Sequence, residues 1–101
     1  EMNKGDIVYI SWGYDQTNVD FYEVIDKSGK ATFTLNEIGK KLDPERDDEY
    51  ADYVLPVPEK KIGEPFKKRL NKNGDFKIHS FAWTSAWNGE SKYETPFGMG
   101  H

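Results

Sequence analysis

The segment ATFTLNEI, residues 31–38, alternates apolar and polar residues and decides the fold class. Successive side chains of an extended strand point to opposite faces. Phe33 and Leu35 therefore share one face with each other, while Thr32 and Thr34 share the opposite face. This period of two is typical of a half-buried β-strand with one solvated face.

Two further strand-like runs precede this segment. Residues 6–12 contain the apolar run Ile-Val-Tyr-Ile, and residues 19–26 are rich in aromatic and β-branched side chains, which favour strands. The polar segments 13–18 and 27–30 separate the runs and are typical of turns. The first 38 residues therefore predict a meander of three antiparallel strands.

The second half of the chain carries weaker strand signals. Residues 53–57 predict a short strand, which Pro56 and Pro58 confine to a sheet edge because proline has no N–H to donate. Residues 66–70 and 75–81 flank an Asn-Gly pair, which predicts a hairpin.

A helix is indicated at one place. Asp43-Pro44 is a helix-start pattern, so residues 43–52 are the best candidate for one short turn. Five to seven short strands in a chain of 101 residues predict a mainly β fold. We expect a small antiparallel barrel or strongly bent sheet, SH3-like or OB-like, with at most one short helix.

Composition sets the broad class. Aromatic residues make up 15% of the chain, enough to build a core although only 36% of residues are hydrophobic. We expect a single domain over residues 2–101, with Glu1 a cloning remnant ahead of the natural start at Met2. The chain has no cysteine and no apolar run near the roughly 18 residues of a membrane span. We expect no cofactor, no metal and no membrane partner.

Charge is segregated along the chain. Residues 43–52 hold six acids and Arg46, a net charge of −5, and residues 60–77 hold seven bases and two acids, a net charge of +5. Both blocks could be solvated faces, and lysines also protect edge strands from aggregation. Alternatively, the acidic block could dock a basic partner or imitate phosphates, and the basic block could contact phosphates with aromatic side chains nearby.

Aromatic residues mark a second candidate surface. Trp12 and Tyr14 belong to the first loop region, and Trp83 and Trp87 belong to a polar, aromatic tail. The tail could pack across an open end of the sheet. It could instead join the first loop in one exposed patch, because tryptophan and tyrosine dominate interface hot spots.

Signals of catalysis are weak. His79 and His101 are far apart in sequence, and the chain lacks a nucleophile elbow, a phosphate-binding loop and a helical metal motif. The spacing of Asp15, Asp20 and Glu23 matches no cation-binding loop. We expect no enzymatic activity. A small hydrolase or metal-dependent enzyme would need a cleft that joins His79 to carboxylates.

Two segments give a resemblance. Gly5-Asp6-Ile7 leading into residues 11–22 (SWGYDQTNVDFY), together with Lys77-Ile78 through Trp87-Asn88-Gly89, resembles small uncharacterised proteins encoded by bacteriophages, plasmids and related bacterial mobile elements. The group has no established activity, so no functional residue carries over. The resemblance implies a location in the bacterial cytoplasm and a host protein as partner.

These observations predict a non-enzymatic module that binds a macromolecule, most simply a bacterial host protein, as an inhibitor of a host defence system would. Its candidate contact residues are Trp12, Tyr14, Asp15, Trp83, Trp87, Asp47, Asp48 and Glu49. The alternative is a nucleic-acid-binding barrel that uses the basic hairpin 60–77. Its candidate contact residues are Lys67, Lys68, Arg69 and Lys72. The sequence makes no prediction of oligomeric state.

Overall fold

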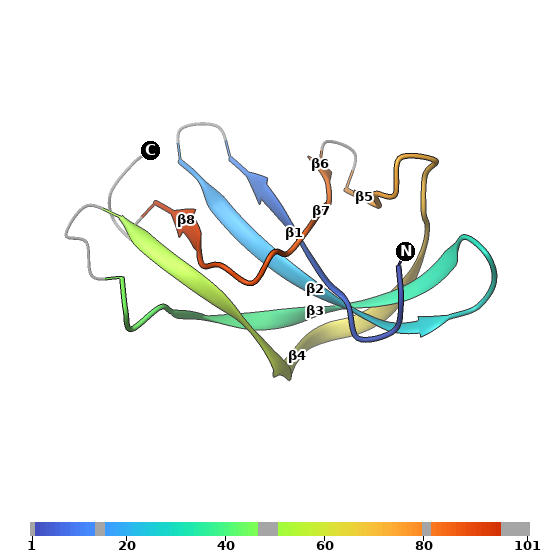
Figure 1. Ribbon diagram of the computed structural model, residues 1–101, viewed down its shortest axis with the longest axis horizontal. Helices are drawn as coiled ribbons and strands as arrows, with labels where there is room; N and C mark the ends of the chain where they lie inside the picture. Colours follow the sequence, from blue (N-terminus) through green and yellow to red (C-terminus); the bar gives the residue numbers. More distant parts are fainter. Residues whose placement is uncertain (1, 14–15, 47–50, 80–81, 96–101) are drawn as a thin grey trace.

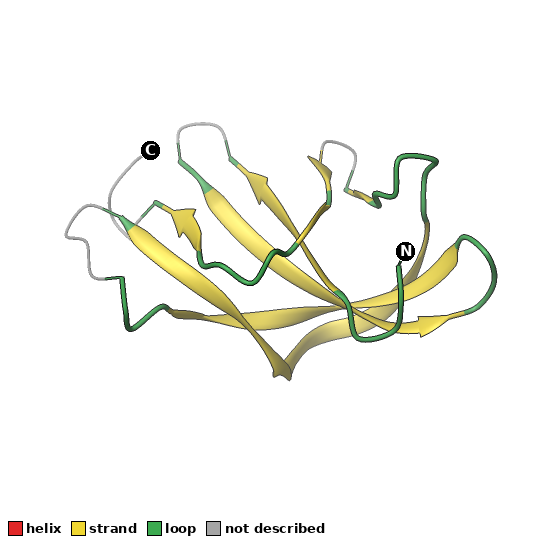
Figure 2. Ribbon diagram, in the orientation of Figure 1, coloured by secondary structure: helices red, strands yellow, loops and turns green. Residues whose placement is uncertain are grey.

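The computed structural model describes residues 2–13, 16–46, 51–79 and 82–95. Every regular element among these residues is a β-strand, and none is a helix (Figure 2). The strands are β1 (Ile7–Trp12), β2 (Asn18–Lys27), β3 (Thr32–Leu42), β4 (Asp52–Arg69), β5 (Lys77–Ile78), β6 (Ala82–Trp83), β7 (Ser85–Ala86) and β8 (Lys92–Glu94). The mainly β prediction is therefore confirmed. Of the helical candidate, residues 47–50 lie outside the described residues.

The predicted meander is present. Strands β1, β2 and β3 pair antiparallel in chain order, with Tyr9 opposite Phe21 and Val24 opposite Leu35. The sheet continues to six strands in the order β7-β1-β2-β3-β4-β8. It curls strongly into a half-barrel, which Figure 1 shows from the side.

Strand β4 corrects the prediction for the middle of the chain. The expected edge strand 53–57 and the expected strand 66–70 are two parts of one strand of 18 residues, paired with the 11-residue β3. The length difference is absorbed where residues 58–60 and 63–65 lie between paired positions, and β4 bends there (Figure 1). Gly63 adopts a positive φ of 67° in this region. Buried Asn36 lies opposite the second irregularity, where its side-chain amide donates hydrogen bonds to the backbone oxygens of Glu37 (2.9 Å) and Ile62 (3.1 Å).

The hairpin predicted around the Asn-Gly pair is wrong in its strand pairing. The turn itself forms, because the Asn71 side-chain oxygen accepts hydrogen bonds from the backbone amides of Asn73 (2.9 Å) and Asp75 (2.8 Å). The strands on either side do not pair with each other, since β4 pairs with β3 and β5 pairs with β6. The physical reason is burial: Phe76 and Ile78 enter the core and carry the chain over the face of the sheet.

The sheet packs on both faces. One cluster comprises Val8, Ile10, Tyr22, Val24, Phe33, Leu35, Phe76, Ile78 and Ala82. The second cluster comprises Val19, Phe21, Ile38 and Val54, with Ile7, Tyr9 and Trp87 packed against it. Side chains that alternate along β1 and β2 therefore enter different clusters, as the pleat of a strand requires.

Antiparallel pairing of β3 and β4 separates the two charge blocks in space. Residues 66–69 lie opposite the start of β3, and residues 54–57 lie opposite its end. The molecule measures 44 × 26 × 24 Å, and β4 runs along much of the long axis in Figure 1. The described residues of the acidic block, 43–46 and 51–52, therefore lie near the end of β3, away from residues 66–69; we refer to these two regions as the acidic end and the basic end.

Candidate functional site

A hollow of about 660 Å³ at the basic end brings together four cationic side chains. Lys30 comes from the turn between β2 and β3, Arg69 from the end of β4, Lys72 from the Asn-Gly turn and Lys77 from β5. No acidic residue is among the described residues that line it. Like charges that converge on one hollow create a positive local potential, although the chain as a whole has a net charge of −4.

Trp83 lies on the wall of the same hollow. Its side chain is 51% exposed, the most exposed of the aromatic residues in the described part of the chain. It lies opposite Lys77 in the β5–β6 ladder, and the Lys77 Nζ atom is 5.9 Å from the centre of the indole ring. The hollow therefore combines cations with an accessible aromatic face.

Hydrogen bonds and core packing fix the wall that carries Lys77 and Trp83. The buried Phe76 ring packs edge-on against Phe33, with ring centres 5.6 Å apart. The Phe76 amide donates to the Thr84 hydroxyl (2.9 Å), and the Thr84 amide donates back to the Phe76 carbonyl (2.8 Å). These two bonds join the residue before β5 to the residue after β6, and the Phe76 ring anchors this end of the ladder to the core.

A second hollow of about 430 Å³ follows the first along the same two segments. Arg69 and Lys77 line the first hollow, whereas residues 66–68 and 78–79 line the second. Tyr22 and Glu37 complete the described part of its lining. We refer to the two hollows together as the basic groove.

The second hollow concentrates ionisable groups. Partial burial raises the pKa of Glu37, and the negative charge of Asp20 adds to this, while Lys40 and His79 oppose it. Burial also raises the pKa of Tyr22, which lies directly across the ladder from Glu37. His79 adopts a positive φ of 58°, which is uncommon for a residue with a side chain and occurs often at functional sites.

The cleft that an enzyme would need is thus present, since His79 and Glu37 line one hollow. The described lining contains no serine, threonine or cysteine, and the described residues contain no cluster of metal-binding side chains. The absence of enzymatic activity stays a prediction.

The other predicted aromatic residues have structural contacts. Trp12 is 38% exposed, and its indole N–H donates to a carboxylate oxygen of Asp20 (2.7 Å). Trp87 packs edge-on against Phe21, and its indole N–H donates to the Glu90 carbonyl (2.7 Å). Five predicted contact residues lie outside the described residues: Tyr14, Asp15, Asp47, Asp48 and Glu49.

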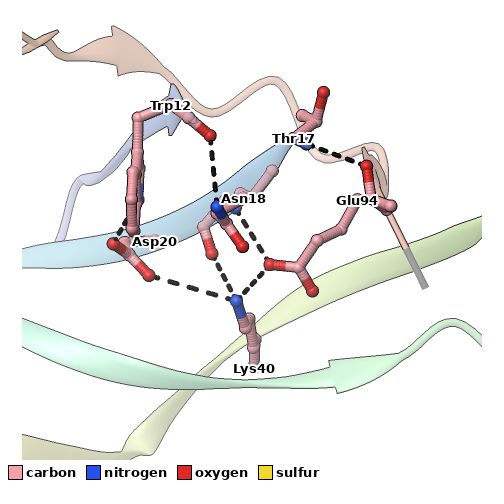
Figure 3. Close-up of polar contacts among 8 residues, drawn as sticks. Trp12, Thr17, Asn18, Asp20, Lys40 and Glu94 are labelled. Carbon is pink, nitrogen blue, oxygen red and sulfur yellow. Dashed lines mark hydrogen bonds and ion pairs between the residues drawn. The ribbon is translucent and has the colours of Figure 1, made fainter. Parts of the chain in front are cut away.

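A polar network at the acidic end has a structural role. Figure 3 shows the Lys40 ammonium between the carboxylates of Asp20, 4.0 Å away, and Glu94. The same ammonium donates to the Val19 carbonyl (2.7 Å), and Glu94 accepts a hydrogen bond from the Val19 amide (3.0 Å). These contacts attach β8 to β2 and β3. We therefore assign no binding role to this network.

The sequence predicted one wall of the basic groove and missed the rest. The set Lys67, Lys68, Arg69 and Lys72 was predicted, and all four residues are among those that line the two hollows. Lys30 and Glu37 were not singled out, because they join the site only through the pairing of β2, β3 and β4. Lys77 lay within the predicted basic block, and its charge was the signal available.

Comparison with protein-family models, curated proteins and solved structures finds no match to this chain. No helix in the described part of the chain is suited to cross a membrane. The resemblance of residues 5–22 and 77–89 to mobile-element proteins stays a prediction. Function has to be argued from the site itself.

Proposed function

We propose that this protein binds single-stranded nucleic acid through the basic groove. The observation that carries the proposal is the convergence of four cations and the exposed Trp83 ring on one hollow whose described lining contains no acid. Two of the four cations, Arg69 and Lys72, belong to the set that the nucleic-acid alternative predicted.

The two components of the hollow match the two parts of a nucleotide. Lysine and arginine neutralise phosphates and release condensed counterions, which supplies sequence-independent affinity. An exposed aromatic ring stacks on an unpaired base, and grooves that bind single strands combine these two features. Trp83 beside Lys77 offers a stacking face next to a phosphate contact.

A single strand fits these features better than a duplex. Bases in a duplex are stacked on one another, so the flat face of Trp83 has no base to receive unless the strand is open. The groove consists of two hollows, and a hollow can receive a base that is not paired in a duplex.

Binding of fluorescently labelled oligothymidine, followed by anisotropy over a series of salt concentrations, tests the proposal. Arg69→Gln and Lys72→Gln should each weaken binding and reduce the log–log salt slope by about 0.7, the value for one phosphate contact on a single strand. Lys41→Gln is the matched control, because Lys41 is exposed on β3 at the opposite end of the ladder. It should bind nearly as the wild type does.

The stacking component has its own variant. Trp83→Leu should cost about 1–3 kcal/mol of binding free energy with little change in salt slope. Tyr93→Leu, which removes an aromatic ring that is 43% exposed on β8, is the control. If the groove variants bind as the wild type does, or if the wild type does not bind, the proposal is wrong.

A protein partner is the second candidate function, and exposed apolar residues at the other end favour it. Leu42 is 61% exposed, and Tyr93 is 43% exposed while its ring packs against Tyr53. Under this alternative the acidic end docks a basic bacterial protein, in keeping with the proposed mobile-element origin and cytoplasmic location. Recovery of the same protein from nuclease-treated and untreated lysate would support it, and complete loss of capture after nuclease treatment would oppose it.

A further inference from the structure

We propose that the second hollow of the basic groove receives a guanine base, with the Glu37 carboxylate accepting hydrogen bonds from its Watson–Crick edge. This inference rests on the proposed binding of single strands, and it adds base selectivity to that function.

The hollow has the walls that a base requires. Phe66 is partly exposed and supplies apolar surface, whereas Tyr22 and Ile78, which also line the hollow, are each 3% exposed; the rings of Tyr22 and Phe66 meet edge-on with centres 5.9 Å apart. Its volume of about 430 Å³ lies within the usual range of about 300–1,000 Å³ for small-ligand sites. Lys68 and Ile78 of this hollow are the chain neighbours of Arg69 and Lys77 in the first hollow.

Glu37 places a carboxylate, a hydrogen-bond acceptor, in this hollow. It lies across from Tyr22 in the β2–β3 ladder, so it faces the same side of the sheet as that core residue. Its carboxylate is partly buried, and the positive charges of Lys40 and His79 act on it. A partly desolvated carboxylate gains most from a ligand that supplies donors.

Guanine is the base whose edge fits this acceptor. Its ring N1–H and its 2-amino group are adjacent donors, which match the two oxygens of a carboxylate, and its O6 is an acceptor for a cation. Lys67 and Lys68 line the same hollow and supply that cation. Adenine and cytosine place an acceptor nitrogen beside their amino group, and thymine flanks its single donor with two carbonyls, so each would set an oxygen or nitrogen lone pair against Glu37.

The test uses oligothymidines that carry one central substitution: guanine, hypoxanthine, adenine or cytosine. The wild type should bind the guanine strand about 10-fold more tightly than plain oligothymidine, within the discrimination of a good bidentate contact. Hypoxanthine keeps N1–H and O6 but lacks the 2-amino group, so the strand that carries it should fall between the two.

Glu37→Gln should abolish the preference for guanine, so that the guanine strand binds no more tightly than plain oligothymidine does to the same variant. Glu64→Gln is the control, because it removes the same charge from an exposed position on β4 and should keep the preference. Thermal unfolding of both variants establishes that they are folded.

The outcomes separate the two proposals. Equal binding of all strands by the wild type, a preference for adenine or cytosine, or a guanine preference that survives in Glu37→Gln would each overturn the inference. If Arg69→Gln still weakened binding in those cases, the proposed function would stand. Absence of binding to every strand would overturn both proposals.

Discussion

Replacing Thr84 by valine tests how the wall that carries Trp83 is held in place. Thr84 is 3% exposed, and its hydroxyl accepts the hydrogen bond of the buried Phe76 amide at 2.9 Å. Valine has nearly the same shape, so the change removes the acceptor without opening a cavity. The Phe76 N–H then has no partner inside the core, although the reverse bond from the Thr84 amide remains.

The magnitude follows from this single unsatisfied donor. A buried donor left without its acceptor costs about 1–3 kcal/mol of unfolding free energy. In a domain of this size, a loss of about 2 kcal/mol lowers Tm by roughly 8–16 °C. Since β5 and β6 carry Lys77 and Trp83, oligonucleotide affinity measured well below Tm should fall as well.

Thermal unfolding followed by circular dichroism provides the measurement. Thr84→Ser is the control, because serine keeps the hydroxyl and loses one methyl group, at a cost of about 0.8 kcal/mol. The valine variant should melt below the serine variant. If Thr84→Val melts at the wild-type temperature, the hydrogen bond to Phe76 does not hold this wall, and the reasoning is refuted.

Three further predictions concern other buried or partly buried polar groups. Burial raises the pKa of Glu37, so the folded state holds the proton more tightly than the unfolded state; this stabilisation is complete below the ordinary value of 4.5 and is lost as the pH rises through the raised value. Urea unfolding should therefore show Glu37→Gln gaining stability relative to the wild type as the pH rises above 4.5, and a constant difference would contradict the assignment. Lys40→Met should destabilise the fold by about 1 kcal/mol, because it leaves the mostly buried Glu94 carboxylate without its cation, and adding Glu94→Gln should recover part of the loss in the same assay. Asn36→Ala should cost about 2 kcal/mol, because the carbonyls of Glu37 and Ile62 lose their donor at the bend of β4, and an unchanged urea midpoint would show that water replaces the amide without cost.

The part of the fold that could be predicted from the sequence is the part built from neighbours in the chain. The alternation in residues 31–38 and the apolar runs before it predict β1, β2 and β3, because short turns join consecutive strands. The Asn-Gly pair correctly predicted a turn. It could not reveal which strands pair, because that depends on Phe76 filling a space between distant strands.

The candidate site likewise combines residues that are close in sequence with residues that only strand pairing brings together. Lys67, Lys68, Arg69 and Lys72 are close in sequence and were predicted as one basic set. Glu37 belongs to β3, and the register of β3 with β2 and β4 determines which face of the sheet its side chain occupies. Prolines 56 and 58 predicted an edge, and among the described residues β8 pairs with β4 only over residues 52–54, so the part of β4 that carries the prolines pairs with β3 alone.

Heteronuclear NMR of the three tryptophan indole N–H groups tests the central claim most directly. The Trp12 N–H is bonded to Asp20 and the Trp87 N–H to Glu90, whereas Trp83 lies on the wall of the basic groove. On titration with a short oligonucleotide, the Trp83 signal should move progressively while the other two stay in place. Movement of the Trp12 or Trp87 signal with Trp83 unchanged, or no movement at all, would contradict binding in the groove.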